Sequence, residues 1–238
     1  MSKILKPLPM PEAPVDLWHL LDQIEAAFAK PPDVANVRHG QRRIHQGGRG
    51  RRTSLFPSRK NNGSIPMESR LELAYGLVLE ANPLVSQYRT QAVEIILASG
   101  QATIPDFLIK TVHGRYLIHE VKPSKLHLQQ RDHDRFSSAK LQLWDMEIEF
   151  AVVDALDLPS ESEVAALLYL YSQGHRQQYS VGQIDLAHTL LKEQRTSDPV
   201  RARAWLHANE LPMDLVSYLQ FHGRWTPGIA ELGRPTWM

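Results

Sequence analysis

Hydrophobic residues recur along this chain with two different spacings, one typical of helices and the other of strands. In residues 67–80 they stand at i, i+3, i+4, i+7 and i+8, namely Leu71, Ala74, Tyr75, Val78 and Leu79. This spacing predicts an amphipathic helix with Pro66 near its first turn. A similar stripe over residues 12–30, followed by Pro31 and Pro32, predicts an N-terminal helix that packs on the core.

Shorter apolar runs predict strands. Residues 103–109 and 115–121 have strand composition, and the polar segment between them ends in Gly114, which suits a hairpin connection. Two further strands are predicted at residues 92–97 and 148–153, and a polar helix is predicted at residues 125–146. Helices and strands that alternate around a mixed sheet define the α/β fold class.

The chain changes character after Pro159 and is predicted to continue as a small α-rich domain. Its helices are expected at about residues 161–171, 181–194, 199–209 and 213–222. Residues 223–238 carry Gly, Pro and Trp without a helical period, which suits a short β-wing. The expected division is therefore an N-terminal helix and basic arm, a core and a C-terminal domain, at residues 1–66, 67–156 and 160–238. The core and lid of the C-terminal domain are expected to contain three tryptophans, Trp205, Trp225 and Trp237.

Composition bounds the class of protein. A chain of 238 residues with 42% hydrophobic content makes one or two domains with a real core. No apolar run approaches the length of a membrane span, and residues 1–14 lack the apolar stretch of a secretory signal. The absence of cysteine excludes disulfides, thiolate catalysis and zinc–thiolate sites. A cytoplasmic protein is the simplest expectation.

The net charge of +1 conceals a strong asymmetry. Residues 34–67 hold seven Arg, one Lys and no acid, so the rest of the chain carries a charge of −7. We expect this segment to be a flexible basic arm that contacts DNA phosphates, although a solvated tail has the same composition. The candidate DNA-binding residues are Arg38, Arg42, Arg43, Arg49, Arg51, Arg52, Arg59 and Lys60, with Lys125 from the polar helix.

Two acids and a lysine fall within the predicted hairpin. Residues two apart on a strand share a face, so Glu120 and Lys122 are expected to project together, with Asp106 across from them. His119 then points the other way and is not expected to be catalytic. A phosphodiesterase needs carboxylate oxygens to hold Mg²⁺ and a cation to orient water and offset charge on phosphorus. The set predicts metal-dependent DNA cleavage.

A third acid is expected from the helix at residues 67–80. Glu68 and Glu72 share a face, and Glu72 is preferred because it sits deeper in the apolar stripe, whereas Glu68 suits the positive helix N-terminus. Each motif alone is also common in scaffolds, as a turn, an exposed strand or a helix start. Their density within apolar strands favours catalysis, because carboxylates there are costly unless paired or metal-bound.

In order, the segments Ser69-Arg70-Leu71-Glu72, Pro105-Asp106-Phe107 and Glu120-Val121-Lys122-Pro123 resemble the restriction-endonuclease-like nucleases, specifically the TnsA-type endonucleases of transposon ends. The resemblance implies a restriction-endonuclease-like mixed sheet flanked by helices and a winged-helix-like C-terminal domain. It implies Mg²⁺, with Mn²⁺ able to substitute, held by Asp106, Glu120, Glu72 and the Val121 carbonyl. The implied catalytic residues are Glu72, Asp106, Glu120 and Lys122.

The same resemblance implies partners. They are the double-stranded DNA of transposon ends, a transposase subunit that cuts and joins the 3′ ends, and an ATPase regulator, in a bacterial cytoplasm and at the nucleoid when active. The chain itself has no phosphate-binding Gly-rich loop. Position 120 is glutamine in some relatives, so Glu120 brings the site closer to an ordinary restriction-type nuclease. Two alternatives follow: a stand-alone restriction-type or junction-cleaving nuclease, and a non-enzymatic DNA-binding subunit.

Overall fold

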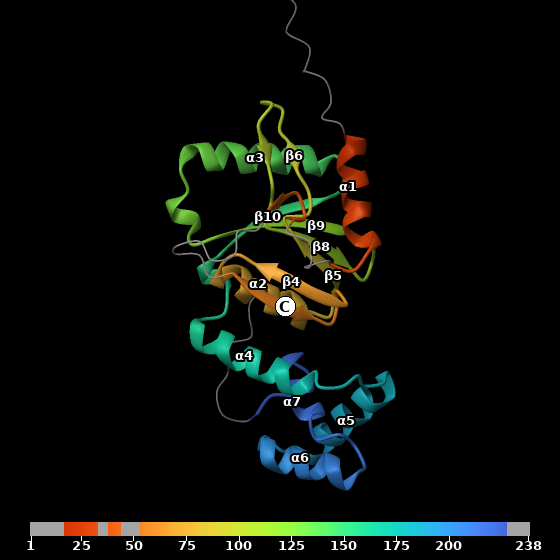
Figure 1. Ribbon diagram of the computed structural model, residues 1–238. Helices are drawn as coiled ribbons and strands as arrows, with labels where there is room; N and C mark the ends of the chain where they lie inside the picture. The colour runs from red at the N-terminus through yellow and green to blue at the C-terminus, as the bar shows by residue number, and fades with distance from the viewer. Residues whose placement is uncertain (1–16, 33–37, 44–52, 228–238) are drawn as a thin grey trace, which may run out of the picture.

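A four-stranded sheet lies at the centre of the upper part of the molecule in Figure 1. The structure is a computed structural model that describes residues 17–32, 38–43 and 53–227. The strand order is β10 (Glu149–Asp154), β9 (Tyr116–Lys122), β8 (Phe107–Thr111) and β5 (Val85–Thr90). β8 is antiparallel to both its neighbours, whereas β10 is parallel to β9. The predicted α/β class with a mixed sheet flanked by helices is confirmed.

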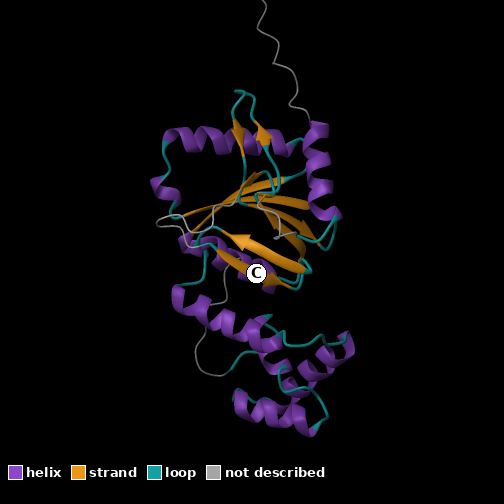
Figure 2. Cartoon of the chain, viewed as in Figure 1, coloured by secondary structure: helices purple, strands orange, loops and turns teal. Residues whose placement is uncertain are grey.

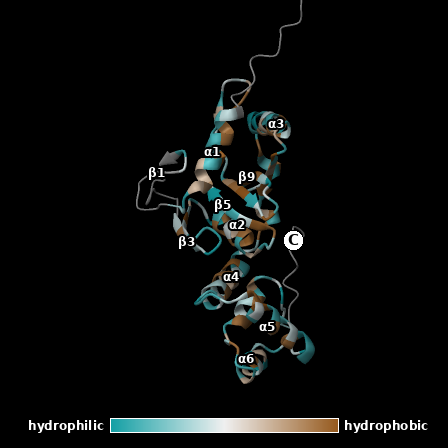
Figure 3. Ribbon diagram, turned by 90° about the vertical axis from the view of Figure 1, so that its right-hand side faces the viewer, coloured by the Kyte–Doolittle hydropathy of each residue, from teal (hydrophilic) through white to brown (hydrophobic). Residues whose placement is uncertain are grey.

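Helices cover both faces of this sheet. Alternation along the strands sends Phe107 and Ile109 to one face, which α2 (Arg70–Ala81) covers, and Leu108 and Ile118 to the other. α1 (Leu17–Ala29) and α3 (Gln130–Trp144) cover that second face. The turned view in Figure 3 shows the same layers, with α1 and α3 above the strands and α2 below them. The N-terminal helix therefore packs on the core, as predicted.

A β-hairpin precedes α2, where the sequence predicted the end of a flexible arm and the first turn of the helix. β3 (Ser54–Ser58) pairs antiparallel with β4 (Gly63–Met67), and Leu55 lies opposite Pro66. The helix begins only at Arg70, where the Ser69 side chain accepts a hydrogen bond from the Glu72 amide at 3.1 Å. Residues 54–67 therefore belong to the packed core, and the predicted start of the helix at residue 67 was wrong.

The strand predicted over residues 92–97 was also misplaced. The sheet strand that precedes the hairpin of β8 and β9 is β5, and residues 92–97 contribute only the two-residue β6 (Ile95–Ile96), which pairs with β7 (Ala102–Thr103). β5 ends in buried polar residues, and Arg89 donates to the carbonyl oxygens of Ala27 and Lys30 at 2.9 and 3.0 Å. These partners lie about sixty residues away in the chain.

The later elements lie close to their predicted positions. The polar helix is split into the short η1 (Lys125–His127) and α3, and η2 (Ala155–Asp157) follows β10. The C-terminal helices are α4 (Glu161–Gly174), α5 (Val181–Gln194), α6 (Pro199–Ala208) and α7 (Leu215–Phe221). Figure 2 shows only helices and loops in residues 160–227, and the predicted wing lies largely beyond them, in residues 228–238, outside the described part.

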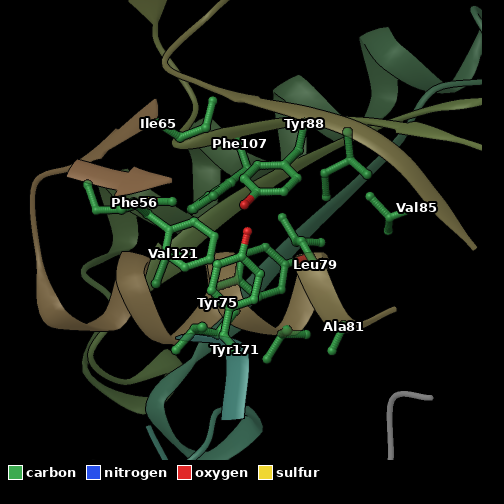
Figure 4. Close-up of a cluster of buried hydrophobic side chains, with 14 of the residues drawn as sticks. Phe56, Ile65, Tyr75, Leu79, Ala81, Val85, Tyr88, Phe107, Val121 and Tyr171 are labelled. Atoms are coloured by element: carbon green, nitrogen blue, oxygen red, sulfur yellow. The ribbon is translucent and has the colours of Figure 1, made fainter. Parts of the chain in front are cut away.

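The C-terminal helices share a core with the sheet. Leu170 and Tyr171 of α4 and Phe221 of α7 pack in the same cluster as Phe56, Tyr88 and other residues of the hairpin, α2 and the strands, most of which Figure 4 shows. A second cluster, around Leu191 and Leu206, joins α5 to α6 and α7 and includes the buried Trp225, whereas Trp205 is partly exposed. α4 and α7 therefore contribute buried residues to the same core as the sheet and α2.

Glu80 joins these parts through a buried polar network. Its carboxylate accepts hydrogen bonds from the Ser58 hydroxyl at 2.6 Å and from the Tyr88 hydroxyl at 3.0 Å. The Tyr171 hydroxyl lies 3.3 Å from the same carboxylate and 2.5 Å from the carbonyl oxygen of Pro57. The backbone amides of Arg59 and Lys60 complete the set at 2.8 and 3.1 Å.

Among the helices of the described residues, none is both long and apolar enough for a membrane span.

Candidate active site

Asp106 stands where β8 begins and is held from two sides. Its Oδ2 atom accepts a hydrogen bond from the Val121 amide of β9 at 2.8 Å. Its carbonyl oxygen accepts one from the amide of Gln91, the residue after β5, at 3.0 Å. Phe107 pairs with His119, and continuing that register places Asp106 opposite Glu120, as the sequence predicted. Asp106 is therefore fixed at one end of the central strands.

Glu120 and Lys122 project to the same side of β9 and form an ion pair. The Lys122 ammonium lies 2.6 Å from Glu120 Oε1, and the Glu120 side chain is only 7% exposed. The strand period that predicted their common direction is confirmed. The half-buried Lys122 ammonium therefore lies beside the buried Glu120 carboxylate at this end of the sheet.

The electrostatics of Asp106 link all four candidate catalytic residues. Burial raises the pKa of Asp106 to about 7, and the negative charges of Glu120 and Glu72 add to the rise. The Val121 amide and the Lys122 ammonium oppose it. A carboxyl group held near neutral pH by neighbouring acids is typical of functional sites, although structural clusters also produce such shifts.

Glu72 is the better placed of the two helix acids. It is buried in the first turn of α2, and its Oε2 atom accepts a hydrogen bond from the Glu68 amide at 2.8 Å. Glu68 precedes the N-cap and lies outside the helix. The burial of Glu72 within α2 and the rise that its negative charge causes in the pKa of Asp106 favour Glu72 as the third acid.

The donor set suits a hard cation in chemical type. Asp106, Glu120 and Glu72 offer carboxylate oxygens, which Mg²⁺ prefers, and a dication would relieve the repulsion that raises the pKa of Asp106. In the described ranges, however, no three His, Asp or Glu side chains are arranged so that they could already hold a metal ion. One of the two Glu120 oxygens, Oε1, is paired with the Lys122 ammonium. Val121 contributes its amide to Asp106, and its side chain lies in the core.

His119 faces away from Glu120 on β9, as predicted. Its Nδ1 atom contacts the hydroxyl group of Tyr75 on α2, and burial lowers its pKa to about 4. The ring is therefore neutral near pH 7 and helps to attach β9 to the helix that carries Glu72.

The predicted DNA-binding residues have different surroundings. Lys60 is a structural residue, because its ammonium contacts the carbonyl oxygens of Leu79, Asn82 and Val85 at the end of α2, and burial lowers its pKa to about 8. The Arg59 guanidinium donates to the His175 carbonyl oxygen at 2.5 Å. Lys60 is therefore occupied within the fold, whereas the exposed Arg59 stays a predicted DNA contact. Lys125, three residues after Lys122, forms a partly exposed ion pair with Asp157 that a phosphate group can replace.

The start of the basic segment is anchored beside Asp106. β1 (Arg38–His39) and β2 (Arg42–Arg43) form a small antiparallel pair, and the Gln41 amide between them donates to the Gln91 carbonyl oxygen at 2.8 Å. Gln91 is the residue whose own amide binds the carbonyl of Asp106. Sequence reasoning missed Gln91, which the structure marks by its burial and by a left-handed backbone with a φ of 49°. Arg49, Arg51 and Arg52 lie outside the described residues.

Comparisons with known proteins do not identify the chain. No protein-family model matches the sequence. A search of curated protein sequences also finds no match. The case for a function therefore rests on the residues and their geometry.

Proposed function

We propose that this protein is a metal-dependent DNA endonuclease with Asp106, Glu120, Lys122 and Glu72 as its catalytic residues. The observation that carries the proposal is that Asp106 lies opposite Glu120, which pairs with the Lys122 ammonium at 2.6 Å, at one end of the sheet. The negative charge of Glu72 also raises the pKa of Asp106. The basic pair β1–β2, anchored through Gln91, supports it because positive charge beside an acidic site guides a phosphate backbone toward it.

Each residue has a chemical role in this proposal. Asp106 and Glu120, with Glu72 and the Val121 carbonyl, would hold Mg²⁺, which supplies Lewis-acid activation of the phosphodiester when bound. Lys122 positions the attacking water and offsets the negative charge that develops on the phosphoryl oxygens. The Val121 amide keeps the Asp106 carboxylate in place. Lys125 exchanges Asp157 for a DNA phosphate.

The cleavage that we propose is at the 5′ ends of a transposon, within a heteromeric transposase. It rests on the order of the acidic motifs and the similarity to TnsA-type endonucleases. A separate transposase subunit would cut and join the 3′ ends, and an ATPase would regulate the choice of target. A transposase gene and an ATPase gene beside this one would support that assignment, whereas a modification methyltransferase gene would favour a stand-alone restriction-type nuclease.

The direct test is strand cleavage by the purified chain. Supercoiled, linear and branched DNA are incubated with Mg²⁺ or Mn²⁺, with and without the neighbouring transposase. We expect nicking that needs the metal and falls by at least about a hundredfold in Asp106→Asn and Lys122→Met, as is usual when electrostatic catalytic groups are removed.

Matched surface changes serve as controls. Asp134→Asn and Lys140→Met alter exposed residues of α3 and should leave nicking unchanged. Nicking by the chain alone on any DNA would favour the stand-alone nuclease. Cleavage that survives in both Asp106→Asn and Lys122→Met would refute the assigned site.

A further inference from the structure

Two histidines face each other where three helices end. His175 is the C-cap of α4, His222 is the C-cap of α7, and their Nε2 atoms lie 3.3 Å apart. The ring centres are 5.4 Å apart, so both Nε2 atoms lie on the ring edges that face each other. The rings are partly buried and pack against Phe221 and Tyr218.

Hydrogen bonds to backbone carbonyls fix the proton positions in both rings. Nδ1 of His175 is 3.1 Å from the Tyr171 oxygen, and Nδ1 of His222 is 3.2 Å from the oxygen of Ala81, the last residue of α2. A carbonyl oxygen only accepts, so each Nδ1 carries the proton and donates. A neutral imidazole has one such proton, and therefore both Nε2 atoms present lone pairs to each other.

The two facing lone pairs repel each other. Near neutral pH, no proton shared between the two Nε2 atoms removes this repulsion. Burial lowers the pKa of both histidines to about 4. The positive charge of Arg59 lowers the pKa of His175 further, and those of Lys60 and Arg224 do the same for His222. Both rings are therefore neutral, with facing lone pairs.

The geometry matches a pair of metal ligands. Imidazole nitrogens bind Zn²⁺ at about 2.0–2.1 Å, and a tetrahedral angle then separates two of them by about 3.4 Å. Histidine ligands usually donate their other ring proton to a carboxylate or a backbone carbonyl, and both rings here donate to backbone carbonyls. The C-termini of α2, α4 and α7 add partial negative charge at the same place.

We infer that His175 and His222 form a binding site for a borderline transition-metal ion, Zn²⁺ or Ni²⁺, which joins α4 to α7 at the end of α2. In the part of the chain that is described, no third His, Asp or Glu completes the set, so water fills the other positions. Mg²⁺ does not suit the pair, because it prefers oxygen ligands. The positive charges of Arg59 and Lys60 weaken binding of a metal cation. With two protein ligands, the site also binds more weakly than one with four.

The test is a calorimetric titration of the full chain, without a polyhistidine tag, with zinc chloride. We expect a zinc site that is lost in His175→Gln and in His222→Gln. The site should persist in Asp106→Asn, which alters the carboxylate cluster, and in His207→Gln, a change of an exposed histidine on α6. Failure of the nuclease proposal would therefore leave this result unchanged.

Zinc binding that survives unchanged in either His175→Gln or His222→Gln would overturn the inference, as would a wild-type chain that binds no zinc. A second measurement does not depend on the folding of variants. X-ray absorption at the zinc edge of the wild-type complex should show scattering from two imidazole rings. A spectrum without imidazole scattering would also overturn it.

Discussion

The Asp106 carboxylate accepts a hydrogen bond from the backbone amide of Val121, with Oδ2 2.8 Å from the nitrogen. This bond fixes the direction of an acid whose neighbours Glu120 and Glu72 both raise its pKa. The protein therefore holds a carboxyl group in a position that disfavours its charged form. Such an arrangement costs stability in the absence of a bound cation, and this cost can be measured.

Asp106→Asn should stabilise the metal-free protein at neutral and higher pH. Burial, with the neighbouring acids, raises the pKa of Asp106 from 3.8 to about 7, so the folded state binds its proton before the unfolded state does. The stability from that proton is complete below about pH 4 and is lost as the pH rises through 7. The advantage of the variant therefore grows between these limits, by at most about 1.4 kcal/mol per pH unit.

Urea unfolding of both proteins in a buffer with a metal chelator measures this difference. Asparagine keeps an oxygen that accepts from Val121, so the hydrogen bond is retained. A difference in unfolding free energy that stays constant across this pH range would show that Asp106 titrates normally.

Glu80→Gln should destabilise the protein strongly. The buried carboxylate accepts from Ser58, Tyr88, Tyr171 and two backbone amides, and a glutamine amide would place its own donors against some of these donors. We expect a loss of about 2–5 kcal/mol in unfolding free energy, as is usual for a broken buried network. Chemical denaturation measures it, with the exposed Glu193→Gln on α5 as the control. Equal stability of the two variants would contradict the network.

Two glycines in the C-terminal helices should respond with opposite signs. A Cβ atom on Gly174 would lie 2.5 Å from the backbone nitrogen of Tyr218, so Gly174→Ala forces α4 from α7 and should cost about 1–3 kcal/mol. A Cβ atom on Gly182 would be 4.0 Å from Ser180 Oγ, its nearest neighbour, and Gly182→Ala should add about 0.5–1 kcal/mol through helix propensity. Thermal unfolding of both variants measures these effects. A shift of the melting temperature with the same sign in both variants would disprove the close approach of Gly174 to the Tyr218 backbone.

Gly40→Ala should weaken DNA binding. Gly40 has a φ of 67°, and its Cβ atom would lie 2.2 Å from the Gln91 carbonyl oxygen, so the change displaces β1 and β2 from their anchor near Asp106. Fluorescence anisotropy with Ca²⁺ measures binding without cleavage. The slope of log affinity against log salt concentration should fall by about one unit for each DNA phosphate that the displaced arginines cease to bind.

Gly100→Ala is the matched control for this change. Gly100 also has a positive φ, at 79°, but open space surrounds its Cβ position. Both substitutions carry a backbone cost of about 1–2 kcal/mol, and only Gly40→Ala disturbs the anchor. Equal DNA affinity of the two variants would show that the anchored basic segment does not contribute to DNA binding.

Local patterns predicted the elements whose partners are close in sequence. The limits of α5 follow from its own apolar spacing and from Ser180 and Gln183, which form a capping box. The pairing of β8 with β9 follows from its period and the turn at Gly114, but β8 lies at residues 107–111 and not at the predicted 103–109, so Asp106 directly precedes the strand. These signals lie within about twenty residues of one another.

Distant contacts decided what the sequence did not predict. β5 holds a buried Arg89 whose partners are in α1 and in the segment after it, and nothing local to residues 85–90 announces this. Lys60 has the composition of a DNA contact, and only the folded chain brings the end of α2 to its ammonium. The anchoring of the basic pair through Gln91 likewise depends on tertiary packing.

The hydrogen bond between Glu80 and Tyr171 has a consequence for biosynthesis. Ninety-one positions separate the two residues, so Glu80 leaves the ribosome long before its partner is made. The sheet and α2 can pair earlier, but their buried acid stays incompletely satisfied until α4 has emerged. Released fragments that end near residue 160 should accordingly be more sensitive to proteases than fragments that include α4.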